Sequence, residues 1–129
     1  MKTGLDIIND IKNVESILGL TVPENGSYTE NDVLSFSVQF SENVVVTGSP
    51  RLALTLGVTP QYATLVSGAG TDTLVFEYTV QAADLDADGI ALNATIDLNS
   101  GTIKDATGKN AALLMTVPDL TGVLVDGTP

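Results

Sequence analysis

The stretch DVLSFSVQF at residues 32–40 decides the fold. Its apolar residues recur at every second position, so in an extended chain they share one face: Leu34, Phe36, Val38 and Phe40. The same period of two recurs in RLALTL at 51–56 and in TLVFEYTV at 73–80. Such alternation is typical of antiparallel strands that have one buried face and one face in water. The sequence therefore predicts antiparallel sheets.

Clusters of turn-forming residues separate these strands, among them PENGS, SGAGTD, DADG, NSG and DATGKN. Short strands at regular spacing with such punctuation indicate a β-sandwich. We expect main strands at 17–22, 32–40, 51–56, 61–66, 73–80, 90–98 and 111–117, with a last extended piece at 122–126.

The first residues have two interpretations. Apolar residues at 7, 11, 14 and 18 form a helical stripe, which predicts a short N-terminal helix before the first strand. Residues 14, 18, 20 and 22 also fit strand alternation, so both remain open. We divide the chain into an N-terminal linker or short helix at 1–16 and one domain at 17–129. The stripe either packs against its own domain or supports self-association through residues 1–18. The start, MKTGLDIIND, lacks the apolar stretch of a signal peptide.

The composition of the chain excludes several classes of partner and site. Sixteen acidic residues against five basic ones give a net charge of −11, which repels nucleic acid and anionic membrane surfaces. No apolar run approaches the roughly 20 residues of a membrane span. The chain has no cysteine and no histidine, which argues against thiolate and most zinc sites and against the common nucleophile systems. The acids lie mostly in turns, so we expect no enzyme. Cations that bind through oxygen ligands, such as calcium, are the partners that this composition allows.

Several motifs occur in order: TVPENGSYTENDVLSFSVQFSENVVVTGSPRLALTLG, YATLVSGAGTDTLVFEYTVQAADLDADGIAL, GTIKDATGKNA and GVLVDGTP. They resemble the bacterial immunoglobulin-like, cadherin-like repeats that stand in tandem in repeats-in-toxin adhesins and other large surface proteins. The resemblance covers residues 17–129. It implies a seven-stranded immunoglobulin-like antiparallel β-sandwich. It also implies a non-catalytic extender or spacer module on the cell surface, with adjacent tandem immunoglobulin-like domains as its partners.

The stretch DLDADG at 84–89 opens like a calcium loop. It is not an EF-hand, because position twelve is Thr95 where that loop needs a glutamate. Strands that alternate in direction nevertheless bring its loop to the same end as PENGS and the C-terminus. The resemblance implies a calcium role at a domain junction, weak in the isolated domain, for five acids at this end: Glu24, Asp84, Asp86, Asp88 and Asp126.

Other interpretations stay open. Aspartates bond to their own backbone, and Gly89 permits a positive φ, so DADG also makes a turn without a metal. As an alternative function, a sandwich with an extra N-terminal segment suits a virion decoration or tail-associated protein on the virion surface. A carbohydrate-binding module needs exposed aromatic rings, and only Tyr28 and Tyr62 fall outside the inward faces.

Overall fold

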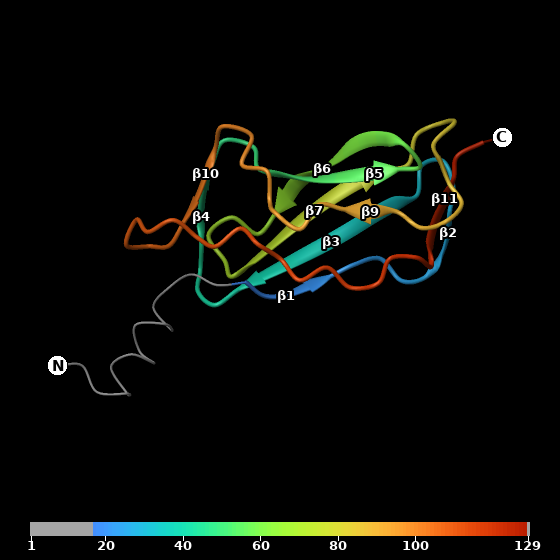
Figure 1. The fold of residues 1–129 in the computed structure, drawn as a ribbon. Coiled ribbons are helices and arrows are strands. Elements are labelled where there is room, and N and C mark those ends of the chain that lie inside the picture. The colour runs from blue at the N-terminus through green and yellow to red at the C-terminus, as the bar shows by residue number, and fades with distance from the viewer. Residues whose placement is uncertain (1–16, 129) are drawn as a thin grey trace.

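Eleven strands form three sheets in the computed structural model, which describes residues 17–128 (Figure 1). The largest sheet is antiparallel and has six strands in the order β1-β3-β7-β6-β5-β9. Their bounds are β1 (Ile17–Thr21), β3 (Val33–Phe40), β5 (Arg51–Leu56), β6 (Thr59–Ser67), β7 (Thr73–Thr79) and β9 (Ala91–Leu92).

Two small sheets stand at opposite ends of the large one and run across its long direction (Figure 1). At one end, β4 (Val45–Thr47) pairs with β10 (Thr102–Lys104). At the other end, β11 (Val123–Asp126) lies between β2 (Gly26–Tyr28) and β8 (Leu85–Asp86). It pairs parallel with β2 and antiparallel with β8.

The core forms against one face of the large sheet. Every second residue of β3, β5 and β7 is buried, because the pleat sends alternate side chains to the same face. The chain after β9 crosses this face (Figure 1) and adds its own apolar side chains to the same cluster: Ile96, Ile103, Ala111, Met115 and Leu120. The sheet and the crossing segment make a sandwich-like arrangement, as the sequence predicts.

The expected strands at 90–98 and 111–117 are wrong. Only residues 91–92 of the first are a strand, and the second has a single isolated bridge, between Leu114 and Thr95. Asn93 and Asp97 accept hydrogen bonds from the backbone N–H groups two residues on, at Thr95 and Asn99. Such side-chain bonds turn the backbone in place of a ladder. Residues 17–128 are therefore all-β and sandwich-like, with eleven strands rather than the expected seven.

The predicted N-terminal helix lies outside the described residues, as does most of the segment considered for self-association. Between residues 17 and 128 there is no helix, and hence none of the length and hydropathy that a membrane span requires.

Candidate functional site

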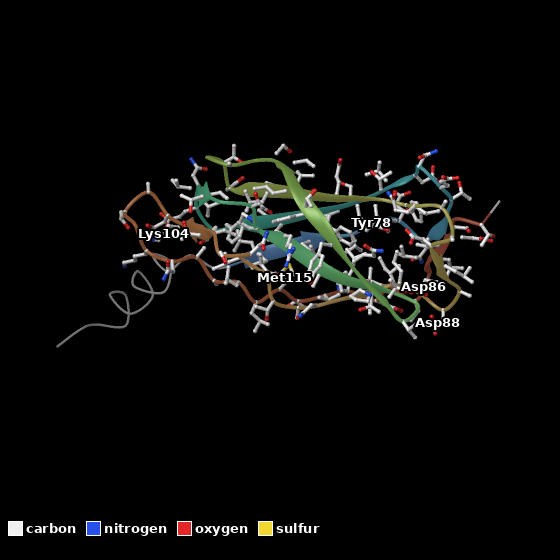
Figure 2. The ribbon with its side chains drawn as sticks, turned by 90° about the horizontal axis from the view of Figure 1, so that it is seen from above. Tyr78, Asp86, Asp88, Lys104 and Met115 are labelled. Carbon is white, nitrogen blue, oxygen red and sulfur yellow. The ribbon has the colours of Figure 1, made fainter. Side chains whose placement is uncertain are left out.

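The three segments that carry the predicted calcium ligands meet at one end. Val123 pairs with Gly26, and Val125 pairs with Asp86, so the small sheet β2-β11-β8 joins all three. The turn between β5 and β6 reaches the same place, because the Gly57 N–H donates to Asp86. Figure 2 shows Asp86 and Asp88 at this end and Lys104 at the other. We call this end, with Glu24, the loop 80–89 and Asp126, the acidic end.

Asp86 is a structural residue of this end. Its side chain is only 3% exposed. One carboxylate oxygen accepts from the Gly57 N–H at 2.7 Å, and the other accepts from the Asp88 N–H at 3.2 Å. A buried carboxylate is stable where backbone donors satisfy it. Asp86 thus ties the β5–β6 turn to the loop that follows β7.

Asp84 closes the same loop from its other side. Its Oδ2 accepts from the Tyr78 hydroxyl and from the Gln81 N–H. Burial raises the pKa of the Tyr78 hydroxyl, and the bond to Asp84 raises that pKa further. The neutral phenol therefore stays a donor to Asp84, and the pair holds residues 78–84 as a closed turn.

The other three acids are exposed. Asp126 Oδ1 accepts from the backbone N–H and the hydroxyl of Thr128, which hold the pKa of this carboxyl below its ordinary value. Glu24 uses its backbone carbonyl to accept from the Tyr28 hydroxyl at 2.6 Å. Asp88 donates its N–H to Asp86. The carboxylates of Glu24 and Asp88 have no hydrogen bond or ion pair within residues 17–128.

The pleat separates the acids. Residues opposite one another in an antiparallel pair share a face, and neighbours along a strand alternate. Asp86 pairs with Val125 and points inward with it, whereas Asp126 pairs with Leu85 on the outer face. No group of three or more acidic side chains within residues 17–128 is placed to hold one metal ion. The calcium role of these five acids stays a prediction.

A second polar cluster, which was not expected from the sequence, lies at the other end. A cavity of about 430 Å³ is lined by Glu42, Asp105, Thr107 and Lys109. Asp105 is buried, and its Oδ1 accepts from the Thr107 hydroxyl and from the N–H groups of Thr107 and Lys109. These bonds, the Thr107 hydroxyl first, hold the pKa of this carboxyl below its ordinary value. The signal was present in DATGKN, where an aspartate precedes a threonine by two residues.

Tyr62 is the exposed ring that a sugar platform would use. The Arg51 guanidinium lies over that ring at 3.7 Å from its centroid, and Arg51 Nε also donates to Asp97 at 2.8 Å. The cation covers one face of the ring, which weakens the carbohydrate interpretation.

Comparison with models of protein families, with curated proteins and with solved structures finds no match.

Proposed function

We propose that the chain is a non-catalytic structural module that extends a larger protein end to end. The resemblance to cadherin-like repeats suggests the setting, an extracellular bacterial surface protein with adjacent immunoglobulin-like domains. It also suggests the finer topology, an immunoglobulin-like sandwich. One observation carries the proposal: the path of the chain through the sandwich.

The described chain starts and finishes at opposite ends of the sandwich. Ile17 pairs with Phe40, the last residue of β3. Thr128 follows β11, and β11 pairs with β2, which precedes β3 along the chain. The eight residues of β3 therefore separate the two places, by about 26 Å at about 3.3 Å per residue. Figure 1 shows β11, the last strand, in the small sheet at one end. In such a module the chain enters at one end and leaves at the other, so modules that follow one another extend the protein by their full length.

The hydrogen bonds of the acids also support a structural role. Asp84 and Asp86 point inward and bond to Tyr78 and to the backbone, which fixes the loop next to the exit of the chain. A rigid loop where the chain leaves the sandwich fixes the direction in which the next domain starts. The resemblance to cadherin-like repeats implies calcium at such a junction.

Two full chains fused in series test the proposal by small-angle scattering. A module that extends gives a maximum dimension close to twice that of the single chain. The matched control is the same fusion with a flexible glycine-serine insert, which broadens the distribution of distances. A two-chain fusion that is as compact as one with folded-back domains contradicts the proposal.

A further inference from the structure

The cavity at the end with β4 and β10 lies between two segments that the small sheet brings together (Figure 1). The two strands are antiparallel, and Lys104 at the end of β10 pairs with Val45 at the start of β4. Glu42, which precedes β4, and Asp105, which follows β10, therefore lie at the same edge of this sheet. Both line the cavity, whose volume of about 430 Å³ is within the range of about 300–1,000 Å³ that small-molecule sites have.

The turn on one side of this cavity is held by its own hydrogen bonds. The Asp105 N–H donates to the Lys109 carbonyl at 2.8 Å, and the Gly108 N–H donates to the Asp105 carbonyl at 3.1 Å. The Asp105 side chain adds three bonds, because its Oδ1 accepts from the Thr107 hydroxyl and from the N–H groups of Thr107 and Lys109. This side of the cavity is therefore formed before a ligand arrives, which lowers the entropy that binding costs.

The second carboxylate oxygen of Asp105 is left without a donor. The side chain is only 6% exposed, yet its Oδ2 has no hydrogen bond or ion pair within residues 17–128. The bonds to Oδ1, that of the Thr107 hydroxyl first, hold the pKa of this carboxyl below its ordinary value, so the group is ionised at neutral pH. A buried, charged oxygen normally has a donor. Since Asp105 lines the cavity, a molecule bound there is in the position to supply that donor.

The cavity also offers a positive charge that its own acids do not neutralise. Lys109 lines the cavity together with Glu42, and both side chains are exposed. The ammonium of Lys109 makes no ion pair with a carboxylate between residues 17 and 128. An ammonium in the lining disfavours a bare metal cation, because like charges repel. Two carboxylates and one separate ammonium instead suit a ligand that carries both signs of charge.

We propose that this cavity binds a small zwitterion, a molecule with a primary ammonium at one end and a carboxylate at the other. The ligand ammonium donates to Asp105 Oδ2 and to the Glu42 carboxylate, and the ligand carboxylate accepts from the Lys109 ammonium. The exposed side chains leave the cavity open to water, so we expect a dissociation constant on the order of 10 mM. The site lies away from the acidic end and does not depend on the proposed function.

An NMR titration of the full chain with 4-aminobutyrate at constant ionic strength tests the site. We expect the amide signals of residues 105–109 to shift and to saturate. Two probes of similar length carry one charge each: n-butylamine lacks the carboxylate, and butyrate lacks the ammonium. Each should bind about fivefold more weakly, as the loss of one exposed ion pair predicts. Shifts that do not saturate, or an amine that binds as tightly as the zwitterion, overturn the proposal.

Variants assign the partner of each charge. Lys109→Gln removes the partner of the ligand carboxylate, so 4-aminobutyrate should bind about fivefold more weakly and no better than n-butylamine. Lys104→Gln is the matched control, because it removes the same charge at the same end from a residue that does not line the cavity, and binding should persist.

The carboxylates are tested in the same way. Asp105→Asn keeps one acceptor oxygen for the turn and directs its NH₂ group toward the cavity, so the saturable shifts should disappear. If that variant loses the turn, Glu42→Gln, at an exposed position, should still weaken binding by about fivefold. Wild-type affinity in both Glu42→Gln and Lys109→Gln would overturn the proposal and leave the structural module standing.

Discussion

Replacement of Asp86 by alanine tests whether the stretch DLDADG stabilises the fold. The substitution removes two acceptors, those of the Gly57 N–H at 2.7 Å and the Asp88 N–H at 3.2 Å. Hydrogen bonds to a charged group contribute about 1.5–3 kcal/mol each. Gly57 and Asp88 are exposed, so water replaces part of the loss. We expect unfolding to become easier by about 3 kcal/mol, a fall of about 10 °C in Tm for a chain of this length.

Urea unfolding in EDTA measures this effect without any bound cation. The matched control is Asp88→Ala, two residues on, whose exposed carboxylate has no partner in the described chain. Its free energy of unfolding should stay within about 0.5 kcal/mol of the wild type. Asp86→Asn should fall between the two, because its amide keeps one acceptor but turns a donor toward the second N–H group. Equal, small losses for both alanine variants would refute the structural role of Asp86.

Three further predictions concern the same loop, acid stability and calcium. Gly89→Ala should lower the free energy of unfolding in urea by more than about 2 kcal/mol, since φ is +103° and a Cβ would lie 2.4 Å from Thr121 Cα. Gly70→Ala, where φ is also positive but the space around the Cβ is open, should lower it by about 1 kcal/mol. The pKa of Asp105 is lowered, so its contribution to stability is present above the ordinary aspartate value near 4 and disappears as the pH falls through the lower folded value. Asp105→Asn should thus flatten the loss of Tm below pH 4, and an unchanged slope contradicts this. Calcium at about 10 mM should raise stability by about 1.4 kcal/mol over EDTA for a Kd near 1 mM, with magnesium as control; a Tm indifferent to calcium leaves DLDADG a turn.

The strands of the large sheet were predictable from the sequence. RLALTL is β5 with the expected bounds, and the strands at 32–40 and 73–80 differ from β3 and β7 by one residue each. These segments have one buried and one wet face, and burial of alternate side chains is what a period of two records. The sequence pattern and the structure both follow from the burial of one face of each strand.

The second half of the chain was not predictable in this way. Ile96, Ile103 and Met115 are buried as strand residues would be, yet the backbone between them is irregular. Asn93, Asp97 and Asp105 bond to their own backbone, so local turns compete with the ladder. Periodicity reports which side chains are buried, but it does not report this competition.

For the candidate site, the sequence predicted which loops lie at the same end, but not the direction in which each acidic side chain points. Alternating strand directions bring the loops with Glu24, Asp86 and Asp126 to one end, as expected. Whether carboxylates converge depends on the pleat of β8, which has two residues and takes its register from β11. A shift of one residue in that register would turn Asp86 outward and Leu85 inward. No local pattern in the sequence determines that register.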